Sequence, residues 1–269
     1  MSVIETSLGR VGLSMAGDGT ATPILFLHGV GSDKSAWRPQ LDHFSAKRRA
    51  IAIDYPGYGE SEIRPDATRD DFAHAALATL DALGIGRAHI CGLSLGGVVA
   101  IAMHAIDPAR CVSMILADSF AVHPEGQSIH DRSVAASHGM TMRALADARA
   151  PLLLGATANR STRAEVIATM AAIDPVAFRI GAAAVWLADQ RDRVALIDVP
   201  TLILVGEEDS VTPPDLSRAL ADQAGSAAHV QPAVTFCRIA RAGHLANLEQ
   251  PGAFNREVDR FLATTEDGA

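Results

Sequence analysis

The sequence predicts an α/β fold in which helices cover both faces of a mostly parallel, doubly wound sheet. Short apolar runs that end in glycine or in a polar loop, typical of strands buried on both faces, alternate with longer helical patterns. This alternation stops near residue 119 and resumes near residue 191, with only helical patterns between. With 269 residues, 48% of them hydrophobic, the chain is long enough for one core with an insertion. We therefore expect a core domain at 1–119 and 191–269 and a helical lid at 120–190.

The predicted elements of the core follow one another in a regular order. After a short N-terminal β-like stretch, we expect buried strands, each marked by an apolar run, within 22–29, 49–61, 87–94, 111–119, 199–209 and 234–240. The segment 49–61 ends in a glycine-rich loop, and 199–209 ends in a polar loop that holds Asp209. Helices are expected between and after them at 35–47, 68–84, 95–106, 213–224 and 251–262. The second helix has clear end signals, because Thr68 can cap it, Asp71 is placed almost as in a capping box, and Gly84 follows its last turn.

Composition and charge restrict the possible partners. A net charge of -8 and a pI near 5.6 argue against nucleic acid, whose binding depends on clustered lysine and arginine. The three cysteines, Cys91, Cys111 and Cys237, have neither the spacing of a zinc site nor an even number for a disulfide framework. The chain shows no secretory leader pattern and no apolar run of 18 residues, so we expect a cytoplasmic protein that does not bind a membrane.

The stretch Cys91-Gly92-Leu93-Ser94-Leu95-Gly96-Gly97 contains the pattern G-x-S-x-G between a predicted strand and a predicted helix. In this context the pattern predicts a nucleophilic serine on a sharp, strained turn, where neighbouring glycines are needed because a Cβ atom would not fit. The alternative is a glycine-rich bend that only packs the helix on the strand. We take Ser94 as the candidate nucleophile.

A serine nucleophile needs a base, and the base needs a carboxylate that orients it. Reactive groups in a parallel sheet gather where the strands end at their carboxyl side, and His244 and Asp209 occupy such loops after the last two predicted strands. Glu208, adjacent to Asp209, and Asp118, at the end of the strand that follows the Ser94 helix, are rivals for the acid. The order Ser94, Asp209, His244 is the chain order of the α/β-hydrolase triad.

Acyl transfer also needs two donors directed at the developing oxyanion. The backbone N–H of Leu95, at the start of the helix after Ser94, is one candidate, and the N–H of Val30, in the turn His28-Gly29-Val30-Gly31, is the other. We expect His28 to hold that turn by hydrogen bonds to the backbone rather than to act on substrate.

Five segments resemble successive landmarks of the α/β-hydrolase fold: LFLHGVGSDKSAW, DYPGYGES, CGLSLGGVVA, PTLILVGEEDSVTPP and AGHLANLEQP. Within this superfamily the chain is similar to the β-ketoadipate enol-lactonase-like group of esterases and lactonases, over about 20–120 and 195–265. The resemblance implies Ser94, Asp209 and His244 as the triad and Val30 and Leu95 as the oxyanion hole. The chain departs from the group in a longer connection at 226–234 and in the lid, where Trp186 and Leu187 replace charged residues.

The function predicted from these residues is a cofactor-free serine hydrolase that cleaves a small carboxylic ester or lactone through an acyl-enzyme on Ser94. A β-ketoadipate enol-lactonase proper, an acyltransferase or a perhydrolase would use the same triad, and a lid-gated small-molecule receptor would retain it without turnover. No residues have the spacing of a metal site, so we expect no metal ion and no cofactor.

The substrate pocket is expected under the lid, with Gly29 and Trp186 as candidate contacts. The apolar run 182–187 ends near Trp186 and offers no counter-charge to a carboxylate, which favours neutral esters or lactones. This expectation fails if an arginine of the lid reaches the pocket. The four candidates are Arg132, Arg143, Arg149 and Arg179.

Overall fold

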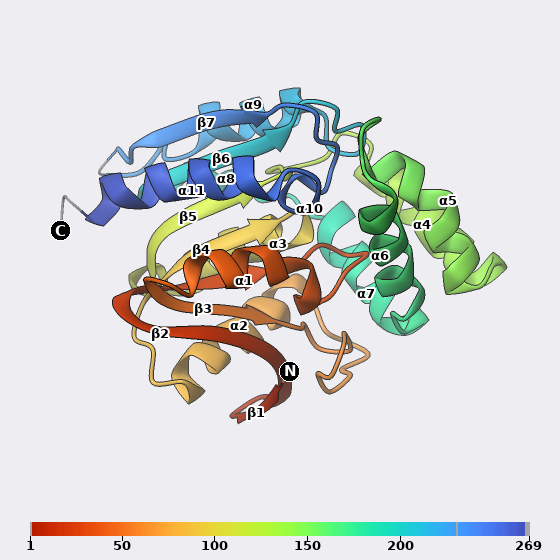
Figure 1. Cartoon of the computed structure of the whole chain (residues 1–269), viewed down its shortest axis with the longest axis horizontal. Helices are drawn as coiled ribbons and strands as arrows, with labels where there is room; N and C mark the ends of the chain where they lie inside the picture. The colour runs from red at the N-terminus through yellow and green to blue at the C-terminus, as the bar shows by residue number, and fades with distance from the viewer. Residues whose placement is uncertain (1, 230, 267–269) are drawn as a thin grey trace.

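The computed structural model describes residues 2–229 and 231–266 and confirms the predicted α/β class. Within these residues seven strands form one sheet, in the order β1-β2-β4-β5-β6-β7 with β3 paired to β2 (Figure 1). The strands are β1 (Ser2–Thr6), β2 (Gly9–Leu27), β3 (Arg48–Ile53), β4 (Ala88–Leu93), β5 (Cys111–Ala117), β6 (Thr201–Gly206) and β7 (Val234–Ile239). The last part of β2 and the strands β4 to β7 run parallel, and β1 pairs antiparallel with the start of β2.

Strand β2 is much longer than the predicted run 22–29, and it lies on both sides of β3. Residues 13–16 pair with residues 53–50, and residues 24–27 pair with residues 50–53. The chain of β2 therefore turns back around β3, which is visible as the red ribbon in Figure 1. The sequence indicated the first half of β2 only as a short N-terminal β-like stretch, because that half is mostly polar and partly exposed.

Helices pack on both faces of the sheet, since successive strand residues point to opposite faces. Leu25 and Leu27 belong to one core cluster and Ile24 and Phe26 to the other. The first cluster includes side chains of α2, α3 and α9, and the second those of α1 and α11. These helices are α1 (Arg38–Phe44), α2 (Arg69–Ala82), α3 (Leu95–Ile106), α9 (Pro214–Gln223) and α11 (Pro251–Glu266); short helices are η1 (Lys34–Trp37), η2 (Pro108–Arg110), α8 (Arg191–Ala195) and α10 (Ala246–Glu249).

The capping box of α2 is formed as the sequence indicates. The Thr68 side chain accepts a hydrogen bond from the Asp71 N–H at 3.3 Å, and the Asp71 carboxylate accepts one from the Thr68 N–H at 2.8 Å. Two of the four N–H groups left free at the helix start are thereby satisfied, which fixes where α2 begins.

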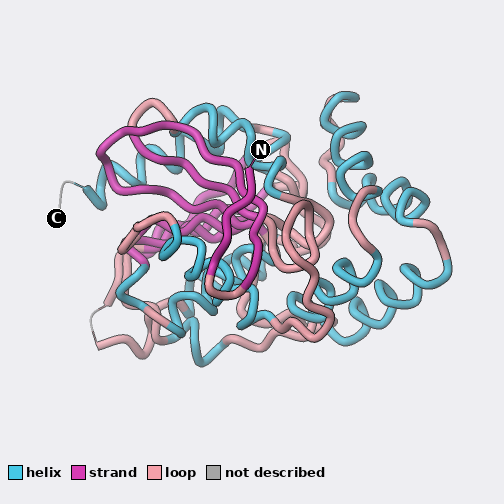
Figure 2. Tube along the Cα trace, turned by 90° about the horizontal axis from the view of Figure 1, so that it is seen from below, coloured by secondary structure: helices cyan, strands magenta, loops and turns pink. Residues whose placement is uncertain are grey.

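Between β5 and β6, four helices precede the short helix α8, and we call these four the cap helices. They are α4 (Gly126–Gly139), α5 (Met142–Leu153), α6 (Arg160–Ala171) and α7 (Pro175–Trp186). Figure 1 shows them gathered beyond one end of the sheet, and Figure 2 shows the same group standing apart from the strands. The strands β4, β5 and β6 end toward this group, so the loops that follow them lie close to the cap helices.

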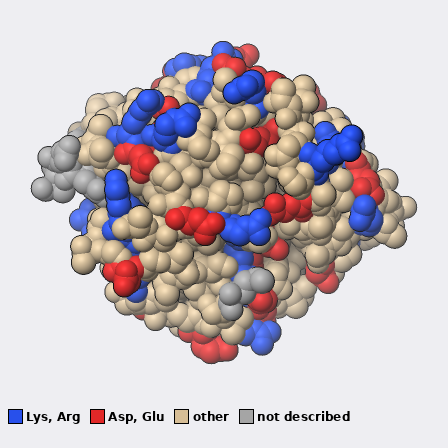
Figure 3. Space-filling model, viewed as in Figure 1, with Lys and Arg blue, Asp and Glu red and all other residues tan. Residues whose placement is uncertain are grey.

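No single helix of the described residues is long and apolar enough to cross a membrane. Together α6 and α7 have the length and apolar composition of a membrane span, but the chain bends by 104° between them. Acidic and basic residues alternate over the face shown in Figure 3 instead of gathering by sign. All three cysteines are free thiols, and Cys91 and Cys111 are buried.

Candidate active site

Ser94 lies on the tight turn that joins β4 to α3. Its backbone has φ 56° and ψ -116°, a left-handed conformation that is strained for any residue with a Cβ atom. The neighbouring glycines allow this turn, because a Cβ at Gly92 would lie 2.1 Å from the Gly96 oxygen and a Cβ at Gly96 would lie 2.0 Å from the Leu27 oxygen. The predicted steric role of both glycines is therefore confirmed. Ser94 Oγ is buried and makes no hydrogen bond to another described residue.

His244 and Asp209 form a buried pair after β7 and β6. His244 Nδ1 lies 2.8 Å from Asp209 Oδ2, and the two residues are 3% and 4% exposed. The other oxygen, Asp209 Oδ1, accepts hydrogen bonds from the N–H groups of Val211 and Thr212 at 2.8 and 3.0 Å. Burial acts to raise the pKa of Asp209, but His244 and Thr212 together hold that pKa below its usual value. Asp209 is thus an ionised acceptor that fixes the orientation of the imidazole ring.

The two rival acids have other partners. Glu208 is exposed and accepts a hydrogen bond from the Ala156 N–H at 2.7 Å. Asp118, fully buried with φ 47°, accepts one from the Gly206 N–H at 2.8 Å. Burial, with the nearby charge of Asp209, raises the pKa of Asp118 well above its usual value. Within this buried pair the surroundings therefore favour the protonated form of Asp118 and the ionised form of Asp209.

The turn after β2 lies next to Ser94. A Cβ placed on Gly29 would be 3.5 Å from the Ser94 Cβ, so the backbone passes close to the serine. The N–H groups of Val30 and Leu95 donate to no other described residue, and Leu95 is the first residue of α3, where helical N–H groups lack partners. Both groups are free to donate to a substrate oxygen.

Buried polar contacts hold this turn in place. His28 Nδ1 lies 2.8 Å from the Gly29 oxygen, as expected for a structural histidine, and burial lowers the pKa of His28. The hydroxyl of Tyr58 donates to the Val30 oxygen at 3.2 Å. Lys34 forms an ion pair with Asp54 within the same region. The tyrosine and the ion pair were not predicted from the sequence, because their partners are distant in the chain.

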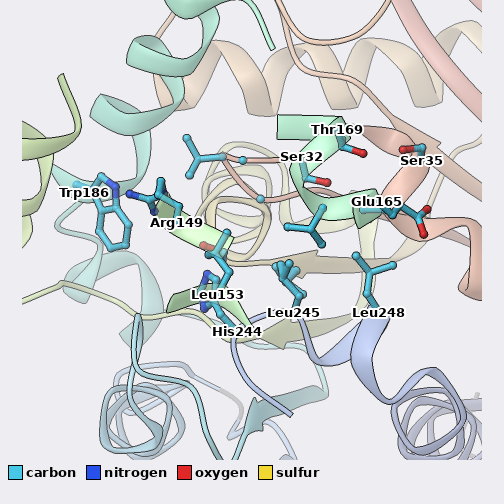
Figure 4. Close-up of a pocket in the computed structure, with 17 residues that line it drawn as sticks. Ser32, Ser35, Arg149, Leu153, Glu165, Thr169, Trp186, His244, Leu245 and Leu248 are labelled. Carbon is cyan, nitrogen blue, oxygen red and sulfur yellow. The ribbon is translucent and has the colours of Figure 1, made fainter. Parts of the chain in front are cut away.

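A pocket opens above Ser94, between the core and the cap helices (Figure 4). Ser94 and His244 line it together with Gly29 and Val30 of the turn after β2. The cap side is contributed by α5, α6 and α7, through Arg149, Leu153, Glu165, Val166, Thr169 and Trp186. The structure thus brings predicted residues from three loops and from α7 to one pocket, while Asp209 and Leu95 do not line it.

Trp186 lines the pocket and is also a core residue. It is 2% exposed and stacks on Phe120, with the ring centroids 5.9 Å apart. The ring of His123 meets it edge-on at 5.5 Å. The two sequence interpretations of Trp186, as packing and as substrate contact, are therefore compatible.

Two residues near the pair were missed by sequence reasoning. The Thr212 hydroxyl lies 2.7 Å from Asp209 Oδ2 and 3.2 Å from His244 Nδ1. Glu249 accepts hydrogen bonds from the N–H groups of Gly243 and Gly155, which ties the His244 loop to the end of α5. The Asp209 side chain caps a short turn in which Thr212 stands three residues later. This spacing is a local signal in the sequence that indicates the contact between Thr212 and Asp209.

The buried groups Asp118, Asp209 and His244 are the described side chains to consider for a metal ion, since their ligand atoms lie within 4.8 Å of one another. The 2.8 Å separation of His244 Nδ1 and Asp209 Oδ2 is the length of a hydrogen bond. A tetrahedral ion bound to both atoms at about 2.0–2.2 Å would hold them more than about 3 Å apart, so the two atoms would have to separate. The geometry therefore fits a proton between them.

A serine on a tight strand-to-helix turn, with a bonded acid and histidine after the last two strands, defines the class of hydrolases built on an α/β sheet. The chain belongs to the alpha/beta hydrolase family, which matches residues 24–257. It is 28% identical to 3-oxoadipate enol-lactonase 1 of Acinetobacter baylyi over 252 residues, which covers 93% of this chain and 92% of the relative.

Solved structures agree with this assignment. A thermophilic esterase from Thermogutta terrifontis, determined with malate bound, matches with a TM-score of 0.87 and 26% identity, covering 98% of each chain. The enol-lactonase from Burkholderia xenovorans LB400 also matches with a TM-score of 0.87, at 25% identity, covering 97% of this chain and all of the other. The chain is an α/β hydrolase similar to esterases and lactonases.

Proposed function

We propose that the protein is a serine hydrolase that cleaves a small carboxylic ester or lactone through an acyl-enzyme on Ser94. The observation that supports this most strongly is the shared pocket, in which Ser94 faces a cavity also lined by His244, whose other side is bonded to Asp209. The similarity to an enol-lactonase and an esterase supports the substrate class.

In the proposed mechanism Ser94 Oγ attacks the carbonyl carbon of the ester while His244 Nε2 takes the hydroxyl proton. The N–H groups of Val30 and Leu95 stabilise the negative oxygen of the tetrahedral intermediate. The imidazolium then protonates the leaving alkoxide, and Asp209 stabilises the ring while it is charged. Water activated by His244 releases the acid and restores Ser94. No cofactor takes part in these steps.

In this proposal the cap helices form a lid over the pocket that contains Ser94. We assign residues 120–190 as a lid over a core of residues 1–119 and 191–269. The N–H of His244 donates to the Leu153 oxygen at 2.9 Å, so the end of α5 contacts the histidine loop directly. The lid restricts the pocket, and it sets which esters reach Ser94.

The test is covalent labelling and turnover. A fluorophosphonate is expected to label the wild-type protein on the peptide that contains Ser94, and Ser94→Ala is expected to lose at least about 10⁴-fold in kcat on p-nitrophenyl acetate. Ser113→Ala is a matched control, because Ser113 is buried in β5 beside His89 and does not line the pocket. Label on another residue, or near-normal turnover by Ser94→Ala, would contradict the assignment.

A further inference from the structure

A short segment of the lid, residues 152–156, is hydrogen-bonded to the loops that carry the acid and the base, and we call it the lid anchor. It forms the end of α5 and the beginning of the turn toward α6. The Leu153 oxygen accepts the N–H of His244 at 2.9 Å, and the Leu152 oxygen accepts the hydroxyl of Ser210 at 3.2 Å. The lid therefore contacts the base itself and the loop of the acid.

Glu249 joins the lid anchor to the histidine loop with both oxygens of its side chain. Oε1 accepts the N–H of Gly243 at 2.9 Å, and Oε2 accepts the N–H of Gly155 at 2.8 Å. Burial raises the pKa of Glu249, and the two N–H donors act in the opposite direction because they favour the ionised form. Because Gly243 directly precedes His244, a single carboxyl group links the lid anchor to the residue next to the base.

Glu208 makes a similar bond from the loop that carries the acid. Its Oε2 accepts the N–H of Ala156 at 2.7 Å, and Asp209 is the next residue in the chain. Glu208 is exposed whereas Glu249 is partly buried, so the bonds of Glu249 are better shielded from water and are the stronger ones. Two consecutive N–H groups of the lid anchor, those of Gly155 and Ala156, thus bind one carboxyl group from each side of the site.

The lid anchor lies so close to the histidine loop that neither can shift without the other. A Cβ at Gly243 would lie 2.5 Å from the Gly155 nitrogen and 3.0 Å from the Leu153 oxygen. A Cβ at Gly155 would lie 2.8 Å from Glu208 Oε2 and 3.0 Å from the Gly243 nitrogen. Backbone therefore packs directly on backbone here, and such close packing transmits a displacement from one segment to the next.

The carboxyl groups of this contact lie outside the cavity above Ser94. Of the described residues that line the cavity, Leu153 and His244 belong to the contact, whereas Glu208 and Glu249 do not line it. Their effect on the reaction must therefore pass through the position of His244. The histidine ring has to stay within hydrogen-bond reach of Ser94, and a displacement of about 1 Å can cost on the order of 10²-fold in rate.

We propose that the lid anchor positions His244, and that Glu249 is the positioning residue that connects the placement of the lid to the base. The inference rests on the proposed function, in which the lid restricts access to Ser94, and it adds a second role for the lid. When the lid anchor is displaced from the core, the base loses its alignment with Ser94. Glu249 thus acts on kcat and not on substrate binding.

The first test is Glu249→Gln, which exchanges one acceptor oxygen for an NH₂ group and leaves one of the two N–H groups without a partner. We expect kcat on p-nitrophenyl acetate to fall at least about tenfold while KM stays within about threefold, because His244 acts in both acylation and deacylation and the two steps slow together. Glu207→Gln is the matched control and is expected to keep the wild-type kcat. Glu207 is exposed, and its side chain makes no hydrogen bond to another described residue.

A second variant tests the same contact from the side of the lid. Gly155→Ala presses a Cβ against Glu208 Oε2 and the Gly243 nitrogen, and it is expected to lower kcat at similar KM in the same way. Gly139→Ala, at the end of α4 in the same lid, is the control, because a Cβ there meets no atom within 4 Å. A wild-type kcat in a folded Glu249→Gln or Gly155→Ala protein would overturn the inference.

The bond between His244 and Asp209 provides a measurement that needs no turnover. The proton on His244 Nδ1, directed at Asp209 Oδ2, is observed by ¹H NMR at low field, and the position of its resonance depends on the geometry of the bond. A shifted resonance in Glu249→Gln, with no shift in Glu207→Gln, supports the positioning role even if no ester is turned over. If Glu249→Gln lowers only the free energy of unfolding in urea, with an unchanged resonance and wild-type ester turnover, the role is merely structural; the inference is then refuted and the hydrolase assignment stays intact.

Discussion

Replacing Asp209 by asparagine exchanges one carboxylate oxygen for an NH₂ group, and the structure determines which one. Oδ1 accepts the N–H groups of Val211 and Thr212, so the asparagine oxygen must occupy that position. The NH₂ group then takes the place of Oδ2, 2.8 Å from His244 Nδ1. Two donors cannot face each other, so Nδ1 becomes the acceptor and the ring proton moves to Nε2, the nitrogen that must accept the serine proton.

The expected cost of this wrong tautomer is about 10⁴ in kcat, which corresponds to roughly 5 kcal/mol in the activation free energy. Asp118→Asn is the matched control, because it makes the same exchange in a second buried acid. The raised pKa of Asp118 favours its protonated form, and an amide reproduces both the acceptor of that form toward the Gly206 N–H and a donor on the other atom. Its kcat is expected to stay within about tenfold of the wild-type value.

The assay is steady-state hydrolysis of p-nitrophenyl acetate by the two purified variants and the wild-type protein at pH 7. Urea unfolding of each protein shows that the compared samples are folded and gives the free energy of unfolding. A larger loss in Asp118→Asn than in Asp209→Asn would refute the reasoning and assign the orienting acid to Asp118. Equal, small losses would show that no carboxylate orients His244.

Two further predictions follow from the same structure. Gly96→Ala places a Cβ 2.0 Å from the Leu27 oxygen and is expected to lower the free energy of unfolding by about 3 kcal/mol or more. Gly86→Ala is the control and is expected to change that free energy little, because a Cβ at Gly86 meets no atom within 4 Å. Equal urea midpoints for the two variants would contradict this expectation. Because the pKa of Asp118 is raised in the folded state, its contribution to stability is fully present below the unfolded-state pKa of about 3.9 and is lost as pH rises through the folded-state pKa. The free energy of unfolding measured in urea should therefore fall less from pH 4 to 8 in Asp118→Asn than in the wild type. Parallel curves for the two proteins would contradict a raised pKa of Asp118.

Local patterns in the sequence predicted the parts of the protein that depend on neighbouring residues. The capping box of Thr68 and Asp71 and the glycines around Ser94 are of this kind, because their contacts span a few residues of the chain. The alternation of apolar runs and helical patterns predicted the parallel sheet in the same way, since each strand must bury both faces. Where the pattern was mostly polar, as in the first half of β2, the sequence indicated only a short β-like stretch and not its length or its partner.

Contacts between distant segments could be decided by the tertiary structure alone. Asp118, Glu208 and Asp209 were all candidates for the acid, and the directions of their side chains at the ends of β5 and β6 decide that Asp209 bonds His244. Four arginines of the lid were equivalent in the sequence, and helix packing places Arg149 in the pocket with Ser94. The physical reason is the same in both cases, because a hydrogen bond or a charge acts over a few ångströms whereas spacing in the chain gives only the approximate position of a loop or helix.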